Sequence, residues 1–559
     1  MSVKRNRILL MLVFSCILLV FGICIKQMPD TYTILDITIS NEGVPQISLV
    51  TQEALSDRLL EKEMTASLEV AWQQDWCETG KYLFLPGCVD LTQVYVRMSC
   101  EGGGEVTLDR IPLDGNATLC VGALSEGEHV LGIDKEEFVF HLVKGSPIAS
   151  LWIDTEESMD YIHEYIEHTT AGKLKLLWAD GSIAYEGAVD SFKGRGNSSW
   201  TTAKRSYGLK LPVSASLLGM SPGTSWTLSG GVLDATGLRN KLFYDMAEAC
   251  GLQNAVEAEW VDLYINGSYY GCYLLTEKIT IGQGRLDIGD LEGETESINE
   301  SGLDSYAPYA DTLAGMQLWG RSIANNPSDI TGGYLLEIEK YDQRFQAEPS
   351  RFVTTNAQPF VIKSPEYASA EQVQYIASFV QEFEEALYAE DGYNTSGGYY
   401  LDYIDLESFV ARHLIDEISK NIDVGYSSHF IYKPRGENKL YAGPVWDYDT
   451  ALGNNGGWGD SAILKSPEGM LANSTGWGEQ LWNKPEFREL SKEMFQERFL
   501  PYLMELSENG LQRYVQDIHA SMAMEHVYIG RTNLEEEIVL LDDFLQKRTI
   551  YLEKELAID

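Results

Sequence analysis

Basic side chains are scarce in this sequence. Its 559 residues include 42 lysines and arginines against 84 aspartates and glutamates, which gives a formal net charge of −42. Bulk electrostatics therefore do not hold the chain to nucleic acid or to anionic lipid, and we expect no nucleic-acid partner. The same charge favours solubility and attracts cations.

Internal repeats and low-complexity tracts are also missing. The composition is that of a globular protein, with 44% hydrophobic and 11% aromatic residues. A chain of this length has room for two or three domains and a large buried core.

Cysteines are few, and none has the spacing of metal ligands, which argues against a thiolate metal site. Beyond the first segment they are Cys77, Cys88, Cys100, Cys120, Cys250 and Cys272. If the chain is exported, this even number predicts disulfides within the first four and between the last two. The pairing among the four stays open, and buried free thiols are the alternative for Cys250 and Cys272.

The first segment contains a long uncharged apolar run, residues 8–25, between a basic tail at 1–7 and Lys26. Its length is at the short end for a membrane-spanning helix. No small-x-small cleavage site follows, so we predict an uncleaved signal anchor, with the tail in the cytoplasm and everything after Lys26 outside the cell membrane. Secretion after cleavage is the alternative, and a lipoprotein site at Cys16 or Cys24 is a poorer one.

Residues 31–145 are predicted to form a small β-rich, sandwich-like domain. Short alternating runs separated by turn residues support this, at 94–98, 106–108, 129–133 and 138–143. The domain contains no chemical constellation, and domains of this kind more often bind or act as spacers than catalyse. A boundary at 145–147 leads into residues 148–559, where the pattern becomes mixed α and β.

A glycine-rich loop follows a predicted strand in this second part. Gly194 and Gly196 allow backbone amides to approach an anion, and Arg195, Lys204 and Lys210 supply positive charge nearby. A tight turn is the default explanation for two such glycines. Lys210 is on the strand face opposite the apolar residues, which fits either a phosphate contact or a solvated surface.

Further elements follow in order. A helix is predicted over 234–251, and an apolar hairpin over 260–276 turns at an Asn-Gly pair and ends at Glu277. The polar stretch 287–331 is long for a structureless loop and is interpreted as an insertion or lid. Glu337 shares one face of the strand 333–339 with Glu339, as a metal ligand or as a solvated edge. Helices are predicted at 158–168, 369–388 and through 484–558.

The acidic residues that are candidates for catalysis lie in the stretch 421–455. A helix over 405–418 leads into a polar loop that carries Asp423, and a hairpin over 430–445 then delivers Asp447 and Asp449. Acidic residues at the two ends of one hairpin lie close together in space.

These carboxylates suit a reaction in which one orients or deprotonates a hydroxyl while others hold a divalent cation on a phosphate. Oxygen ligands favour magnesium, manganese or calcium over zinc. An ordinary solvated turn also explains an Asp-x-Asp motif, and the pairing with Asp423 favours a site.

Taken in order, these pieces resemble the spore coat protein H (CotH) kinase family, whose members are atypical relatives of protein kinases. The similarity covers roughly residue 148 to the C terminus. The motifs that carry it are Gly194-Arg195-Gly196-Asn197-Ser198-Ser199-Trp200 with Lys204 and the strand 206–211, Leu238-Arg239-Asn240-Lys241, Asn266-Gly267 with 270–278, the segments 333–337 and 362–366, Asn421-x-Asp423, and Trp446-Asp447-x-Asp449 with Gly453.

The resemblance implies an α+β, two-lobed kinase-like domain that transfers the γ-phosphoryl group of ATP to serine or threonine of exported proteins, with Mg²⁺ or Mn²⁺. Asp423 then engages the substrate hydroxyl, Asp447 and Asp449 bind the metal, and residues 275–277 form a hinge that meets adenine. The expected nucleotide-binding residues are Gly194, Arg195, Gly196, Lys204, Lys210, Arg239 and Glu277.

Two departures from the kinase pattern stand out. Where an asparagine for the second metal is expected, the sequence has Ser427-Ser428-His429, which leaves His429, Asn421 and Glu337 as second-metal or supporting candidates. Arg239, not a glutamate, marks the helix expected to position the phosphate lysine, and Glu337 is the substitute candidate. The alternatives to a protein kinase are a non-catalytic surface scaffold and a nucleotide-dependent transferase with another acceptor.

Overall fold

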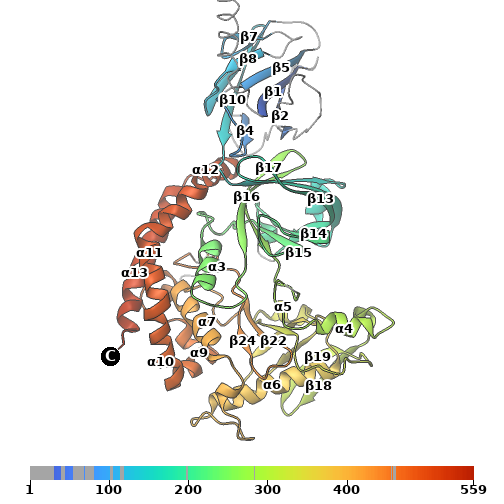
Figure 1. The fold of residues 1–559 in the computed structure, drawn as a ribbon, viewed down its shortest axis with the longest axis vertical. Coiled ribbons are helices and arrows are strands. Elements are labelled where there is room, and N and C mark those ends of the chain that lie inside the picture. The colour runs from blue at the N-terminus through green and yellow to red at the C-terminus, as the bar shows by residue number, and fades with distance from the viewer. Residues whose placement is uncertain are drawn as a thin grey trace, which may run out of the picture. The chain divides into compact units, whose positions relative to one another are not determined.

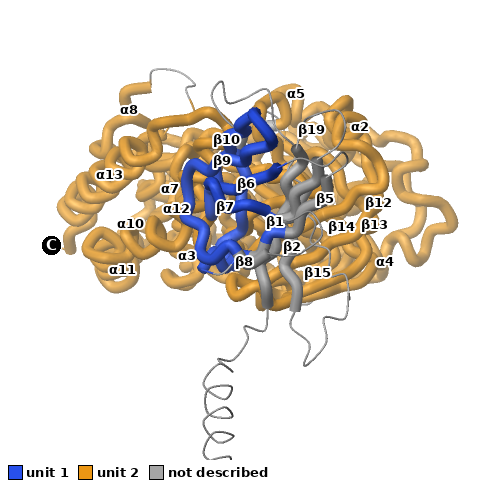
Figure 2. The backbone as a smooth tube through the Cα atoms, turned by 90° about the horizontal axis from the view of Figure 1, so that it is seen from above, with its two compact units in different colours: residues 1–144 blue, residues 145–559 orange. Residues whose placement is uncertain are grey.

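The computed structural model describes residues 31–39, 45–53, 68–69, 81–92, 94–100, 105–113, 119–196, 199–282, 284–454, 456 and 461–558 (Figure 1). The chain divides into unit 1, Met1–Lys144, and unit 2, Gly145–Asp559 (Figure 2). The predicted anchor at 8–25 lies outside the described residues. Within them, no helix combines the length and the apolar character that crossing a membrane requires.

Unit 1 is built from strands. Its described part forms two five-stranded sheets, with the orders β3-β2-β1-β5-β8 and β4-β10-β9-β6-β7. The strands are β1 (Thr31–Ile39), β2 (Pro45–Glu53), β3 (Leu68–Glu69), β4 (Lys81–Leu85), β5 (Val94–Cys100), β6 (Val106–Leu108), β7 (Ile111–Leu113), β8 (Leu119–Gly122), β9 (Gly127–Ile133) and β10 (Glu136–Lys144). In the second sheet Leu131, Phe140 and Leu142 are buried on alternate positions, as the strand pattern requires. The four runs predicted as strands lie in β5, β6, β9 and β10.

Unit 2 begins with a closed seven-stranded barrel in the order β11-β12-β13-β14-β15-β17-β16. The strands are β11 (Ala149–Thr155), β12 (Thr169–Leu177), β13 (Ile183–Arg195), β14 (Ser206–Ala215), β15 (Gly223–Ser229), β16 (Ala258–Ile265) and β17 (Ser268–Glu277). Parallel pairing of β11 with β16 closes it. Leu151, Phe192, Trp226 and Leu275 belong to its packed interior. Ser158 caps α2 (Met159–Glu164), which is shorter than the predicted helix.

The second sheet of unit 2 has seven strands in the order β18-β19-β21-β22-β20-β23-β24. They are β18 (Pro308–Leu313), β19 (Met316–Arg321), β20 (Tyr334–Ile338), β21 (Arg351–Val353), β22 (Pro359–Ser364), β23 (His429–Lys433) and β24 (Tyr441–Ala442). The stretch 287–331 supplies α4 (Leu291–Ser297) and the hairpin of β18 and β19. Its interpretation as a lid is wrong, because Leu291, Met316 and Leu318 are buried in the core.

The remaining helices of unit 2 pack on this sheet, on the barrel and on one another. They are α3 (Arg239–Ala249), α5 (Asp342–Ala347), α6 (Ala370–Tyr388), α7 (Leu406–Ser419), α8 (Ala462–Lys465), α9 (Gly476–Trp482), α10 (Pro485–Met494), α11 (Leu500–Glu505), α12 (Leu511–Ile529) and α13 (Leu534–Glu555). Ser369 and Gln372 form a capping box at the start of α6. The last helices run along one side of unit 2, where α12 contacts β17 and α13 contacts α7 (Figure 1).

Arg548 ties α13 to the end of α7. Its fully buried guanidinium lies 3.1 Å from the Glu417 carboxylate and donates to the Glu417 carbonyl oxygen at 2.6 and 2.9 Å. It also donates to the carbonyl oxygens of Pro467 and Gly469, both at 2.8 Å. One side chain from the C-terminal helix therefore anchors two neighbouring segments.

The predicted disulfide between Cys250 and Cys272 is absent, and both residues are buried free thiols. Cys250 caps the C-terminal end of α3, with its sulfur 3.9 Å from the carbonyl oxygen of Arg498. Cys272 lies within β17. Burial raises the pKa of the Cys250 thiol to about 12 and raises that of Cys272 as well, so both stay protonated.

Candidate active site

The loop that carries Asp423 follows α7, which begins at its predicted cap, Asp405. Lys420 adopts a left-handed conformation (φ 45°) and ends the helix. The loop is then held by β20 and the residue after it. The Ser428 amide donates to Glu337 Oε1 at 3.1 Å, and the Ser427 hydroxyl donates to Glu339 Oε2 at 2.9 Å. The two predicted strand carboxylates therefore support the Asp423 loop.

Asn421 joins this loop to the segment of Asp447 and Asp449. Its side-chain amide donates to the carbonyl oxygen of Asp447 at 2.7 Å, and its Oδ1 accepts from the Thr450 hydroxyl at 2.6 Å. On the other side, the Tyr448 amide donates to Asn240 of α3 at 2.6 Å. The two acidic segments are therefore brought together, and Asn421 is a buried brace.

Replacing Asn421 with alanine is expected to lower the free energy of unfolding by about 1–3 kcal/mol, because two buried polar groups lose their partner. Any reaction that depends on Asp447 should slow in parallel. Denaturant unfolding measures the first effect, with Asn509→Ala at an exposed position of the helical turn Leu506–Gly510 as the control, expected within about 0.5 kcal/mol of the unchanged chain. Equal stability of the two variants would remove the bracing role.

The three aspartates share one electrostatic environment. Burial and, next, the negative charge of Asp447 raise the pKa of Asp423 to about 7. Burial raises the pKa of Asp447, against the opposing charges of Arg195 and Arg344. Burial also raises the pKa of Asp449, with further contributions from the other two aspartates. Like charges crowded in this way are relieved by a bound cation.

This donor set fits Mg²⁺ or Mn²⁺ better than a metal enclosed by protein. In the described part of the chain, no three His, Cys, Asp or Glu side chains are arranged to hold a metal ion by themselves. Mg²⁺ is commonly bound by one or two carboxylates together with substrate phosphates and water. Asp447 and Asp449 would be those carboxylates.

Two arginines bring positive charge to the aspartates. Arg195 ends β13 and lies over the Trp446 ring, 5.2 Å from its centroid. Arg344 comes from α5 and was missed in the sequence, where no motif marks it. Its Nη1 donates to the Ser427 hydroxyl at 3.3 Å and lies 3.7 Å from Glu339 Oε2. Arg344 also lowers the pKa of Asp423, so its charge reaches both acidic segments.

A further lysine lies near Arg195. Lys278 is exposed and directly follows β17. Desolvation lowers the pKa of its ammonium group, and the nearby charges of Arg195, Lys363 and Lys193 lower it further, against one opposing carboxylate, Glu366. Positive charges gathered in so acidic a chain attract an anion. Lys278 and Lys363 lie in the motifs 270–278 and 362–366, but no site role was predicted for either lysine.

Comparison with known families matches residues 192–552 to the family described as CotH kinase protein. The chain belongs to the CotH kinase family. A comparison with curated proteins found no match. The matched region begins within β13 and includes both acidic segments, whereas unit 1 lies outside it. A kinase-like function follows from membership, and the individual roles of the residues stay predictions.

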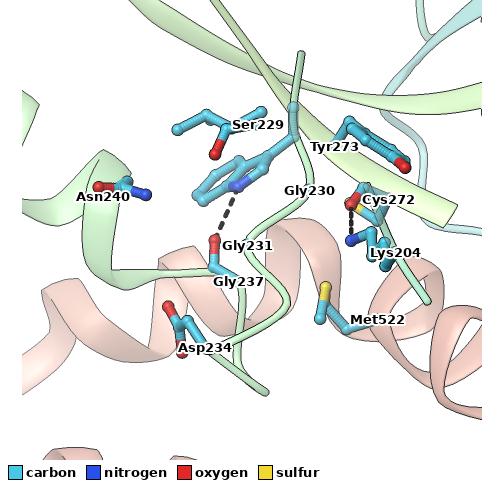
Figure 3. Close-up of a pocket in the computed structure, with 12 residues that line it drawn as sticks. Lys204, Ser229, Gly230, Gly231, Asp234, Gly237, Asn240, Cys272, Tyr273 and Met522 are labelled. Atoms are coloured by element: carbon cyan, nitrogen blue, oxygen red, sulfur yellow. Dashed lines mark hydrogen bonds between the residues drawn. The ribbon is translucent and has the colours of Figure 1, made fainter. Parts of the chain in front are cut away.

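In this CotH family member, the predicted phosphate lysine Lys204 is buried away from solvent. Its ammonium donates to the carbonyl oxygen of Cys272 at 2.6 Å (Figure 3). It also donates to Glu525 Oε2 at 2.5 Å. It also lies 4.7 Å from the centroid of the Tyr273 ring. The cavity that it borders has a volume of about 20 Å³, enough for one water molecule and too small for a phosphate group.

The acid that pairs with Lys204 is therefore Glu525 of α12 and not Glu337. Glu337 lies 3.8 Å from Lys363 instead. The Lys204–Glu525 pair is also fixed by the Cys272 amide, which donates to Glu525 Oε2 at 2.9 Å. These bonds join α12 to the barrel, and a contact of Lys204 with nucleotide stays a prediction.

The other two cationic residues predicted to bind nucleotide, Lys210 and Arg239, also differ in their burial. Lys210 is exposed on β14 between Leu209 and Leu211, which are buried in the barrel. Arg239 is buried at the start of α3, where it pairs with Asp234 and donates through Nε to the carbonyl oxygen of Ala451 at 2.9 Å. Arg239 therefore holds the segment that follows Asp449. Neither observation tests whether Lys210 or Arg239 binds nucleotide.

The two glycines of the loop, Gly194 and Gly196, are explained by different structural requirements. A Cβ at Gly194 would lie 2.0 Å from the Trp200 ring, so the close approach of this tryptophan requires glycine. Gly196 has φ 89°, a conformation that glycine adopts readily. Residues 197–198 are outside the described ranges. Packing and turn geometry explain both glycines, and their contact with phosphate stays a prediction.

Glu277, the predicted hinge residue, ends β17 and lies 2.9 Å from the Arg285 guanidinium. Burial raises its pKa to about 7 against the charge of Arg285. It borders a cavity of about 270 Å³ together with Glu248, Asn254, Glu257 and Thr280. Its amide donates to the Glu257 carbonyl oxygen at 3.3 Å, so this N–H group is already used within the fold.

His429 faces α7. Its Nδ1 lies 3.6 Å from Asp416 Oδ2. Burial, followed by the charges of Arg412 and Lys340, lowers the pKa of His429 well below its ordinary value, so the imidazole is neutral. At that distance Nδ1 makes no hydrogen bond to Asp416, and within the described residues it has no other hydrogen-bond partner. The structure does not test His429 as a metal ligand.

Proposed function

We propose that this CotH family member transfers the γ-phosphoryl group of ATP to a serine or threonine hydroxyl of a protein, with Mg²⁺ or Mn²⁺. The observation that carries the proposal is the shared electrostatic environment of Asp423, Asp447 and Asp449, within reach of Arg195 and Arg344. Phosphoryl transfer uses one carboxylate to accept a proton and others to bind a metal ion. It also uses cationic side chains that contact the phosphate oxygens. Family membership supports the same class of reaction.

Asp423 is the proposed proton acceptor. A carboxylate with a pKa of about 7 is matched to accept a proton from a hydroxyl near neutral pH. The Tyr341 hydroxyl donates to Asp423 Oδ1 at 3.5 Å and orients it. Arg195 and Lys278 would contact phosphate oxygens, which brings the terminal phosphate towards Asp423. A bound divalent ion supplies positive charge at those oxygens, held by Asp447 and Asp449.

We further propose that unit 2 acts as a two-lobed, kinase-like domain. The barrel would be one lobe, and the seven-stranded sheet with its helices the other. Bonds from α3 to the acidic segment, through Asn240 and Arg239, support this arrangement because α3 follows β15 of the barrel directly. Residues 8–25 are proposed to anchor the chain in the cell membrane with unit 2 outside, or to be removed on secretion. Protease access to unit 2 on intact cells tests that location.

Thermal unfolding with ATP tests the proposal. ATP at about a hundred times its dissociation constant should stabilise the native protein by about 2.7 kcal/mol, and the unfolding temperature should rise. The rise should need Mg²⁺ or Mn²⁺ and should be lost in Asp447→Asn. Phosphate incorporation into a protein acceptor then separates a kinase from a transferase that moves AMP or uses a sugar. No rise with either metal would overturn the proposal in favour of a non-catalytic scaffold.

A further inference from the structure

Two exposed tyrosines flank the predicted catalytic aspartate. Tyr341 is 37% exposed and Tyr426 is 41% exposed. Their ring centroids lie 4.7 Å apart, with an interplanar angle of 72°. Tyr341 reaches Asp423 through its hydroxyl, and the Tyr426 amide donates to the Asp423 carbonyl oxygen at 2.8 Å. We call these two side chains the tyrosine pair.

The tyrosine pair is built on fixed backbone. The Lys340 amide donates to the Tyr426 carbonyl oxygen at 2.9 Å, and the Tyr341 amide donates to Glu339 Oε1 at 2.8 Å. The Arg344 guanidinium lies 4.5 Å from the centroid of the Tyr341 ring. Two segments distant in the sequence therefore hold these rings in place. Aromatic rings fixed in this way lose little conformational entropy when a partner covers them.

The position of the pair decides which partner it fits. A hydroxyl that loses its proton to Asp423 must lie beside Tyr341 and Tyr426, so the residues next to that hydroxyl meet the two rings. Rings at a steep angle offer an edge and a face to a third planar group, the arrangement that aromatic side chains prefer. Because Arg344 lies over Tyr341, less of that ring is left for the flat face of a sugar.

We propose that the tyrosine pair is the acceptor-docking surface, and that it selects polypeptides in which an aromatic residue is next to the target serine or threonine. This inference rests on the proposed function and deepens it by naming the acceptor class. Arg344 acts as a positioning residue, which supports Tyr341 by stacking and the Asp423 loop through Ser427.

Binding of two peptides to the full chain tests the inference without requiring catalysis. One carries a central serine between two tryptophans, and the other has glycine in place of both tryptophans. We expect the tryptophan peptide to bind about tenfold more tightly, since one aromatic contact has that effect. Tyr426→Ala should remove this preference and leave the ATP-dependent rise in unfolding temperature unchanged. Tyr393→Ala, at a tyrosine that is 50% exposed elsewhere in unit 2, should keep both.

Equal binding of the two peptides, or a preference that survives in Tyr426→Ala, would overturn the inference. Tighter binding of maltohexaose than of the tryptophan peptide would overturn it in favour of a sugar acceptor. These results are distinct from failure of the proposed function, which would appear as a missing ATP-dependent rise in the unchanged chain. Tyr341→Phe adds a second readout, because it keeps the ring and removes the bond to Asp423. It should preserve the preference for the tryptophan peptide and lower the rate of transfer.

Discussion

Asp447→Asn is expected to reduce phosphoryl transfer by about 10³-fold or more, since the charge that holds the metal contributes several kcal/mol to the transition state. The fold should be retained. Asn421 bonds only the Asp447 carbonyl oxygen, which the substitution leaves in place. Without metal the variant should be at least as stable as the unchanged chain, because one of three crowded carboxylates is neutralised. Phosphate incorporation and thermal unfolding measure the two effects.

Asp543→Asn is the matched control for Asp447→Asn. Asp543 is exposed on α13 and pairs with Lys547 at 2.7 Å, an interaction within one helix face. Its loss should change stability by about 0.5 kcal/mol at most and should leave transfer unchanged. Full activity of Asp447→Asn, with the control also active, would remove Asp447 from the reaction.

Lys204→Met is expected to lower the free energy of unfolding by about 3–5 kcal/mol, because it leaves the Glu525 carboxylate buried without its partner. Both side chains of this pair are at most 3% exposed. The effect should appear in denaturant unfolding. Any protein that folds should still show the ATP-dependent rise in unfolding temperature, because Lys204 does not face the aspartates.

A double variant separates charge from packing at this site. Lys204→Met with Glu525→Leu removes both charges and should recover much of the lost stability, since an apolar pair of similar volume often replaces a buried ion pair without loss. Lys210→Met, at an exposed lysine on the adjoining strand, should lie within about 0.5 kcal/mol of the unchanged chain. Loss of ATP binding in the double variant, with the fold retained, would restore Lys204 to the nucleotide site.

Local sequence signals predicted much of the fold around the site. Asp405 begins α7 as expected because a carboxylate at this position accepts from the Ser408 amide, at 2.9 Å. Asn266 and Gly267 both have positive φ, which the turn between β16 and β17 requires. The convergence of Asp423 and Asp447 was predictable because a short hairpin separates them in the chain.

Contacts between distant segments were not predictable in the same way. Glu525 lies 321 positions after Lys204, and no local pattern connects them. Arg344 belongs to a six-residue helix without a motif, and its role depends on the loop of Ser427 folding against it. Lys278 follows a strand that was predicted, but its cationic neighbours come from β13 and β22. A sequence shows which side chains are present, and tertiary packing decides which charges remain accessible.

The bonds from α12 and α13 have a consequence for synthesis of the protein. Asp449 leaves the ribosome 99 residues before Arg548, which secures the end of α7, and Glu525 also follows it. At roughly 5–20 residues per second, about 5–20 seconds pass between the two events. During this time the nascent chain contains every predicted site residue. The bonds from Glu525 to the barrel and from Arg548 to the end of α7 have not yet formed. A premature stop codon in α12 would therefore release a chain with a complete set of site residues and no working site.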